Sequence, residues 1–312
     1  MSADGVAADE SRLAPRHGPV GGLLRTRNFA LLWIGESTSA VGSAITTVAL
    51  PLVAVSTLHA GAAMVALLTA ATWLPWLLIG LPAGVLIDRW PRRRTLLIAD
   101  LVSAVVLVII PIAAWTHVLT MTMLLVAALL VGTAGIFFNV AFNAFLPHLV
   151  SARDLLEGNA KLQTSASVAL VLGPALGGLL AQAAGAVTGI LIDSFTFLVS
   201  AACLLGLRPA PESHPSASGR PGMLRQIAEG IAFIMHGPLL RAMLVVAAVT
   251  NFAMLGITAL RVVFLVRTDG ATPATAGFVI GVGSLGGILG AALASRAARH
   301  FGSARTYLVA NV

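Results

Sequence analysis

The sequence carries little charge: only 10% of its 312 residues are Asp, Glu, Lys or Arg, against roughly 25% in soluble domains. Apolar residues make up 58%, and the mean hydropathy is +0.95. So small a share of charge excludes an ordinary soluble domain, because too few polar side chains remain to cover a water-facing surface. The composition therefore predicts a membrane protein.

Cysteine is equally scarce, since Cys203 is the only one and lies inside an apolar stretch. A single cysteine excludes a disulfide within the chain. The seven histidines are scattered among termini and connections, and no group of His, Cys, Asp or Glu has the spacing of metal ligands or of an activated nucleophile. We therefore expect no enzyme activity, no cofactor and no metal site.

Long apolar runs are abundant. A helix needs about 20 residues to cross a bilayer, at about 1.5 Å per residue. Runs of this kind predict eight spanning helices, at residues 29–57, 62–87, 95–115, 119–145, 160–184, 187–207, 240–266 and 272–295. Residues 303–312 predict the start of a ninth. The expected fold is an all-α polytopic membrane protein with a complete six-helix N-terminal half and a partial C-terminal half.

The basic residues are placed unevenly along the chain. Of the 19 Lys and Arg, 17 lie in the N-terminal segment or in the connections after even-numbered runs, and only Arg261 and Arg267 fall toward the other side. This asymmetry is the positive-inside pattern, and it predicts that the N-terminus is cytoplasmic. The protein itself is expected in the cell membrane, that is, the plasma or inner membrane. The net charge of +7 would also fit nucleic-acid binding, but its distribution over membrane connections argues against that partner.

The connection after the sixth run, LRPAPESHPSASGRPG, is rich in Pro, Ser and Gly, as flexible linkers are. Apolar residues then recur at helical spacing from Leu224 to Ile234, which predicts a helix lying in the membrane interface. We expect four units: a cytoplasmic segment at 1–28, a six-helix half at 29–207, a cytoplasmic linker with the interfacial helix at 208–238, and a truncated second half at 239–312.

Two segments repeat at long range. GVLIDRWPRR carries Arg89 and Arg92 after the second run, and AALASRAARHFG carries Arg296 and Arg299 after the eighth. The offset of 207 residues fits six helices plus a linker. It implies two six-helix halves in parallel repeat.

The first of these segments resembles the loop signature between helices two and three of the major facilitator superfamily, Gly-x-x-x-Asp-Arg-x-x-Arg-Arg. The matching residues are Gly84, Asp88, Arg89, Arg92 and Arg93. Pro91 stands where the family usually has Gly. The resemblance implies a cytoplasmic gating loop that latches the two halves together in the outward-open state. Plain topology and contact with lipid headgroups are the alternative.

A second motif, LGPALGG, resembles the antiporter motif of drug and metabolite exporters in that superfamily. Its residues are Gly173, Pro174, Gly177 and Gly178, for which a kink with close helix packing is the alternative. With RNFALLWIGE at the first span, the chain is similar to the branch that contains enterobactin and macrolide exporters.

This resemblance implies efflux of a small amphipathic compound, such as a drug, siderophore or secondary metabolite. Export would proceed by alternating access with proton antiport, by a monomer if the chain is complete. Because the sequence stops early in a ninth span, a second hypothesis is a non-transporting fragment of such a carrier, or a membrane component that needs a partner chain.

Ionisable residues inside spans are candidate functional sites. Glu36 lies about 10 Å into the first span, and polar residues follow it on one helix face. They are Ser39, Ser43, and Thr46 or Thr47. We expect this stripe to line a wet cavity in which Glu36 carries protons. Alternatively, Glu36 only accepts hydrogen bonds there or reaches back to Arg25 or Arg27.

Asp193 is a second proton-coupling candidate, with a hydrogen bond to a neighbouring helix as its alternative. Asp100 is expected to be a structural partner of the nearby arginines. Asn139, Asn143 and Gln163 are candidates to line the cavity, or else to join helices. In the eighth span, Gly283 with Gly287 and Gly286 with Gly290 predict a smooth face for close packing.

Overall fold

The computed structural model describes residues 22–87, 90–151, 154–208, 232 and 235–301. Regular structure in these residues is helical, which confirms the all-α expectation. The helices are η1 (Gly22–Arg25), α2 (Arg27–Ser56), α3 (Ala62–Ile87), α4 (Arg92–Trp115), α5 (Met121–Leu149), α6 (Leu155–Ala184), α7 (Ala186–Gly206), α9 (Pro238–Val263), η2 (Phe264–Thr268) and α10 (Pro273–Phe301).

Each of the eight apolar runs overlaps one of these helices and extends at most two residues beyond it, except that the run 240–266 continues from α9 into η2. Seven described stretches are long and apolar enough to cross a membrane: α2, residues 62–80 of α3, α4, α5, α6, α7, and α9 with its π-helical end to Thr268. The apolar part of α10, Pro273–Gly287, is shorter than a full span. The expected interfacial helix lies almost entirely, and the ninth span wholly, outside the described residues.

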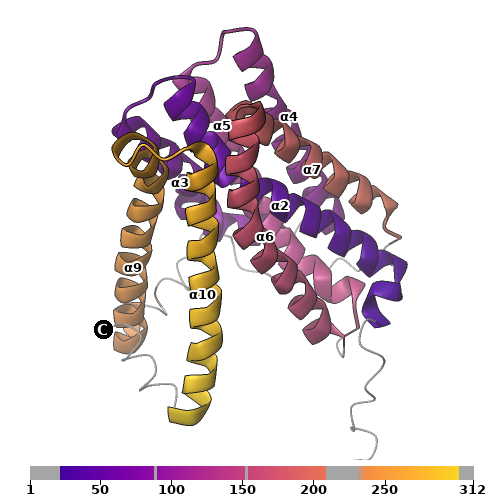
Figure 1. The fold of residues 1–312 in the computed structure, drawn as a ribbon. Helices are drawn as coiled ribbons and strands as arrows, with labels where there is room; N and C mark the ends of the chain where they lie inside the picture. The colour runs from indigo at the N-terminus through magenta and orange to yellow at the C-terminus, as the bar shows by residue number, and fades with distance from the viewer. Residues whose placement is uncertain (1–21, 88–89, 152–153, 209–231, 233–234, 302–312) are drawn as a thin grey trace, which may run out of the picture.

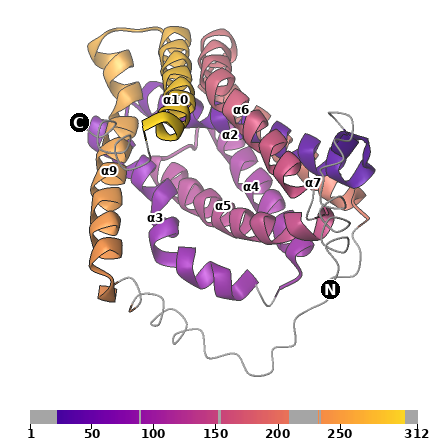
Figure 2. The ribbon, with the colours of Figure 1, turned by 90° about the horizontal axis from the view of Figure 1, so that it is seen from below.

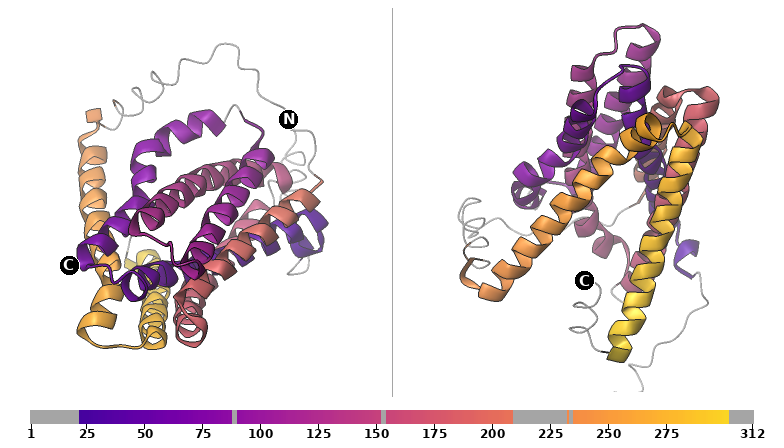
Figure 3. Two further views of the ribbon diagram at one scale, coloured as in Figure 1. Left: turned by 90° about the horizontal axis from the view of Figure 1, so that it is seen from above. Right: turned by 60° about the vertical axis from the view of Figure 1, so that its left-hand side comes forward.

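Helices α2 to α7 form a six-helix bundle in which spatial neighbours follow the order α6, α2, α7, α4, α5, α3. The remaining two helices attach to the ends of that row, since α10 packs on α6 and α9 packs on α3 (Figures 1 and 2). Helices α9 and α10 diverge from the connection that joins them (Figure 3). In the described residues, the second part of the chain therefore contacts the first mainly through α10 on α6, with smaller contacts of α9 on α3 and on α2.

The interior of the six-helix bundle is layered. One apolar cluster contains Val48 and Ile110, and a second contains Phe29, Leu96 and Leu204 near the opposite end. Between them, α2, α4 and α7 place a layer of buried polar side chains. These are Ser39, Asp100, Ser103, Asp193, Ser194 and Ser200. The fold thus encloses polar groups where burial without partners is costly.

Small residues let α2 and α7 approach closely over several turns. A Cβ at Gly35 would stand 3.1 Å from Cys203 Cβ, and a Cβ at Gly42 would stand 2.5 Å from Asp193 Oδ1. One further heptad along α2, Ala49 meets Gly189 of α7. This seven-residue repeat of small contacts brings the polar groups of α7 against α2.

Candidate functional site

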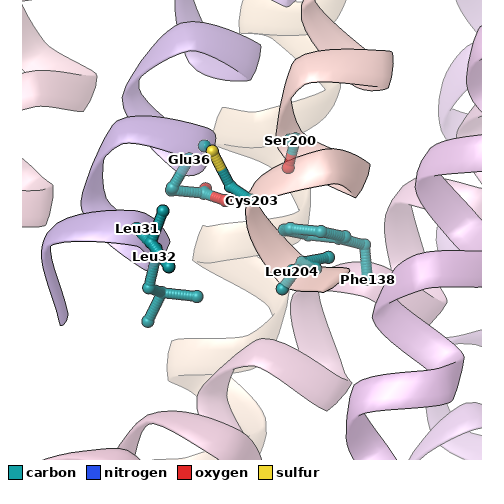
Figure 4. Close-up of a pocket in the computed structure, with 8 residues that line it drawn as sticks. Leu31, Leu32, Glu36, Phe138, Ser200, Cys203 and Leu204 are labelled. Atoms are coloured by element: carbon teal, nitrogen blue, oxygen red, sulfur yellow. The ribbon is translucent and has the colours of Figure 1, made fainter. Parts of the chain in front are cut away.

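Glu36 lies in a small pocket between α2, α5 and α7, and its side chain extends from α2 toward α7 (Figure 4). The pocket is narrow: its roughly 170 Å³ of empty space includes open solvent, and it has no enclosed room for a water molecule. The lining residues are Leu31, Leu32, Gly35, Glu36, Phe138, Ser200, Cys203 and Leu204. A carboxylate therefore faces mostly apolar side chains, together with one hydroxyl and one thiol.

The Glu36 carboxylate is incompletely partnered. Its Oε2 is buried and accepts no hydrogen bond, and Trp33 Nε1 and Ser37 Oγ, within one turn of it, are also buried without partners. The ion pair formed among the described residues joins Lys161 to Glu157 at 3.4 Å, not Glu36 to Arg25 or Arg27. The geometry does not support the alternative that Glu36 reaches back to these arginines.

Asp100 of α4 is only 1% exposed, and neither of its carboxylate oxygens has a hydrogen-bond partner. Ser200 of α7 and Glu36 of α2 are both near enough to affect the charge of the Asp100 carboxyl, but neither forms a hydrogen bond with it. The expectation that Asp100 pairs with the nearby arginines is therefore wrong for the residues described.

The arginines at the start of α4 have other partners. Arg93 donates from Nε to the Leu204 carbonyl at 2.9 Å and from Nη2 to the Leu205 carbonyl at 2.8 Å, at the C-terminal end of α7. A helix C-terminus attracts cations because its last carbonyls lack intrahelical donors. Arg92 contacts His148 near the end of α5.

Asp193 is as buried as Asp100, but its carboxylate accepts a hydrogen bond from another helix. Thr46 Oγ1 of α2 donates to Asp193 Oδ2 at 2.5 Å, and Thr196 Oγ1 lies 3.2 Å from Oδ1. The bond from Thr46 ties α7 to α2, which is the hydrogen bond to a neighbouring helix that was the alternative for Asp193. Nearby, Ser194 donates to the Ala104 carbonyl at 2.8 Å and ties α7 to α4.

The predicted polar stripe on α2 is divided in space. Ser39 is buried whereas Ser43 is exposed, and neither lines the Glu36 pocket. Thr46 turns inward to Asp193, whereas the hydroxyl of the exposed Thr47 donates to the Ala44 carbonyl. The four residues share a face, but Ser39 and Thr46 lie along its inner edge and Ser43 and Thr47 along its outer edge, so packing in the bundle covers only the first pair.

The other candidate cavity residues lie on the surface of the described structure. Asn139 and Asn143 share one exposed face of α5, and Asn143 Nδ2 donates to the Asn139 carbonyl at 2.8 Å. Gln163 is exposed on α6.

The predicted gating loop is described only in part. Asp88 and Arg89 lie outside the described residues, while Gly84 near the end of α3 has open space where a Cβ would stand. Trp90 directly follows Asp88 and Arg89 in the sequence. Its ring stacks on Phe137 of α5, with ring centroids 5.9 Å apart. With Arg92 and Arg93, these contacts join the loop to α5 and α7.

The glycines of LGPALGG permit close contact on two sides of α6. A Cβ at Gly173 would overlap Ala44, and one at Gly177 would stand 2.8 Å from the Ile45 carbonyl, both on α2. Gly178 faces α10, where an added Cβ would overlap the Pro273 carbonyl and stand 3.0 Å from Gly277 Cα. Pro174 lies inside α6, whose helix runs unbroken past it.

The glycines that α10 uses for packing differ from those expected. Gly283, Gly286, Gly287 and Gly290 have open space at their Cβ positions in the described structure. Close packing instead occurs at Gly277, against Pro174 and Gly178, and at Gly281, where a Cβ would stand 2.5 Å from the Val171 carbonyl. Both sets have small residues four apart, and only the position of α6 decides which set packs.

Known proteins similar to this chain are transporters. The multidrug efflux pump Tap of Mycobacterium tuberculosis H37Rv is 28% identical over 222 residues, covering 68% of this chain and 52% of that protein. Tap of Mycolicibacterium fortuitum is 28% identical over 289 residues, covering 90% of this chain and 69% of that protein. Macrolide efflux protein A of Streptococcus pyogenes is 27% identical, covering 74% and 57%. The chain thus spans about half the length of the first of these relatives.

Solved structures share the fold. A bacterial homologue of the human lysosomal transporter Spinster, inward-facing and unoccupied, matches with a TM-score of 0.69 at 16% identity, over 89% of this chain and 64% of that chain. The same homologue in an occupied state matches with a TM-score of 0.63. Because the profile of transmembrane secretion effectors matches residues 20–312, the chain belongs to that family of the major facilitator superfamily.

Proposed function

We propose that this chain acts in efflux, exporting a small amphipathic compound across the cell membrane by alternating access in exchange for protons. The observation that carries the proposal is the Glu36 pocket, where a carboxylate oxygen is buried without a hydrogen-bond donor or cation. A membrane-buried carboxylate of this kind is costly unless it has a task, and binding a proton removes its charge.

The helix contacts support a rocking motion between two units. We take residues 29–207 as one unit and residues 239–312 as part of the second, joined by 208–238 and preceded by the cytoplasmic segment 1–28. Their main described contacts are α6 with α10, α3 with α9 and α2 with α9. On the α6 side, backbone meets backbone at Gly178 and Gly277, and this close packing of small residues is the contact about which we propose that the two units rock.

The remaining candidates receive roles within this scheme. The loop of Gly84, Asp88, Arg89, Arg92 and Arg93 would be the cytoplasmic latch, with Arg93 holding the end of α7. The exposed Ser43, Asn139, Asn143 and Gln163 would contact substrate. For Asp193, the hydrogen bond from Thr46 favours tethering over proton coupling.

A second proposal is a non-transporting fragment or a component that needs a partner chain. The observation that favours it is the exposed apolar surface of α9, where Phe252 is 82% exposed. Large exposed apolar patches mark lipid-facing or partner-facing surfaces.

Transport in proteoliposomes separates the two proposals. The purified chain would be reconstituted in vesicles with an acidic interior and offered a radiolabelled macrolide or a fluorescent cationic dye outside. An antiporter accumulates the compound only while the proton gradient lasts, and a protonophore abolishes accumulation. Absence of accumulation with both probes would contradict independent transport and favour the second proposal.

A further inference from the structure

Asp100 has no role in the efflux scheme proposed for Glu36, yet its position links it to that residue. Asp100 lies eight residues after the start of α4 and Glu36 nine after the start of α2, which is about 12–14 Å along each helix axis. Both starts lie beside the C-terminal end of α7: Arg93 binds the Leu204 carbonyl, and Asn28 binds Arg208. The two carboxylates thus lie at similar depth from the same end of the bundle.

Ser200 of α7 lies where both carboxylates meet. It lines the Glu36 pocket and is 2% exposed, and it lies near enough to Asp100 to affect the charge of that carboxyl, although the two form no hydrogen bond. Gly35 makes this possible, because an added Cβ would stand 3.3 Å from Ser200 Cα. Side chains of α2, α4 and α7 therefore converge on one hydroxyl.

No described cation neutralises this cluster. Among the described residues, the titratable groups on the helices around it are Arg27 and Glu36 on α2, Arg92, Arg93, Arg94 and Asp100 on α4, His148 on α5, Glu157 and Lys161 on α6, and Asp193 and Cys203 on α7. Lys161 is paired with Glu157 at 3.4 Å. The arginines and His148 lie at helix ends, and Arg93, two turns before Asp100, is bound to α7 carbonyls. Asp193 is occupied by Thr46 and Thr196.

Two carboxylates that share a buried site cannot both hold a negative charge without a large cost, because the low dielectric strengthens their repulsion and removes their hydration. One proton on the pair relieves this repulsion. Such groups titrate together, so protons bind to the pair and not to either residue alone.

We propose that Glu36 and Asp100 form one proton site, in which a single proton passes between the two carboxylates by way of the Ser200 hydroxyl. An O–H bond of one carboxylic acid breaks as the proton moves to Ser200 Oγ, while the Ser200 proton moves to the other carboxylate. The net charge of the pair is unchanged by this step. The inference deepens the proposed efflux function and rests on it for its purpose.

Infrared difference spectroscopy tests the pair without requiring transport. The full chain in lipid nanodiscs would be titrated while the C=O band of protonated carboxyl groups is followed, in wild type, Glu36→Gln, Asp100→Asn, Asp100→Glu and Ser200→Ala. The exposed Asp154, which accepts a hydrogen bond from Ser151, supplies the matched control Asp154→Asn.

A coupled pair predicts that Asp100→Asn shifts both the frequency and the titration midpoint of the Glu36 band, and that Glu36→Gln shifts those of Asp100. Asp100→Glu, which keeps the carboxylate, should restore coupling, and Ser200→Ala should slow hydrogen–deuterium exchange of the band. Asp154→Asn should change neither. If the band of each carboxyl keeps its frequency and its titration midpoint when the other residue is substituted, Glu36 and Asp100 do not form one proton site.

Transport then separates failure of the pair from failure of the function. In proteoliposomes, Asp100→Asn should lose gradient-driven accumulation but keep gradient-independent substrate exchange, and Asp100→Glu should recover accumulation. Full gradient-driven accumulation by Asp100→Asn, with unchanged spectra, would overturn the pair and leave efflux intact. If the wild type transports nothing, the efflux proposal fails, and the infrared titration alone supports or overturns the pair.

Discussion

The interface between α2 and α7 contains two polar clusters that lie two helical turns apart. They differ in whether their buried carboxylates accept hydrogen bonds. At Gly42, the Asp193 carboxylate accepts a hydrogen bond from Thr46, and the Thr196 hydroxyl, which donates to the Asp193 backbone carbonyl at 2.7 Å, lies 3.2 Å from Oδ1. At Gly35, Glu36 and Asp100 approach Ser200, and their buried oxygens have no donors. Because Asp100 and Asp193 are both 1% exposed, burial alone does not distinguish a tethering carboxylate from one available to bind a proton. The presence of donors does.

The two clusters make opposite contributions to stability. A buried acceptor that receives hydrogen bonds contributes to the free energy of unfolding, whereas one left without a donor lowers it by its uncompensated desolvation. We interpret the cluster at Gly42 as a tether between helices. The cluster at Gly35 lowers the free energy of unfolding, and residues that destabilise the fold in this way are typical of functional sites.

The largest expected effect is the loss of proton-driven export in Glu36→Gln. The amide keeps the shape of the side chain but cannot exchange a proton, so accumulation in acid-loaded proteoliposomes should fall to the level of vesicles without protein. Insertion into the membrane should be unchanged, as measured by the yield of monodisperse protein in detergent. Undiminished accumulation by this variant would remove Glu36 from the coupling mechanism, and Glu36→Asp is the variant that should keep partial activity.

A second prediction breaks the tether by steric means. In Gly42→Val the new side chain would collide with Asp193 Oδ1 and with Thr196 Cβ, which stand 2.5 and 2.9 Å from a Cβ there. The free energy of unfolding should fall by about 3 kcal/mol, the upper end of overpacking costs. Gly135→Val on α5 is the matched control, because nothing lies within 4 Å of its Cβ position. Unfolding in mixed micelles, followed by tryptophan fluorescence, measures both, and equal losses would contradict the contact.

A third prediction compares the two aspartates directly by replacing each with leucine. Asp193→Leu leaves the Thr46 hydroxyl without its acceptor and should lower the free energy of unfolding by about 1–2 kcal/mol. Asp100→Leu removes an unpartnered buried carboxyl and should be neutral or raise it by about 1–3 kcal/mol. The same micelle unfolding assay checks the opposite signs. If both substitutions destabilise equally, the distinction between the clusters is wrong.

Sequence periodicity predicted the elements of this fold well. Apolar runs located eight helices because spanning length is a one-dimensional property of the chain. Glu36 could be singled out for the same reason, as an acid within an apolar run. The family motifs likewise lie in contiguous stretches, which is why the amino-acid sequence alone was enough to predict a major facilitator fold.

Pairings between helices could not be read in the same way. Asp100 and Ser200 are 100 residues apart, and nothing near Asp100 in the sequence points to α7. Arg93 binds backbone carbonyls, and carbonyl acceptors carry no sequence signal. On α10, Gly277 and Gly281 have the same spacing as Gly283 and Gly287, so only the placement of α6 distinguishes them.

The smallest expected effect concerns the hydroxyl that supplies the tether. Thr46→Val preserves the shape of the side chain but removes the donor to Asp193, and it should lower the free energy of unfolding by about 1 kcal/mol. In combination with Asp193→Leu, the loss should be smaller than the sum of the single losses, because both substitutions remove the same hydrogen bond. Thr47→Val is the control, since that hydroxyl bonds only the Ala44 carbonyl of its own helix. Strict additivity in this double-mutant cycle would mean that the 2.5 Å contact contributes nothing to holding α2 against α7.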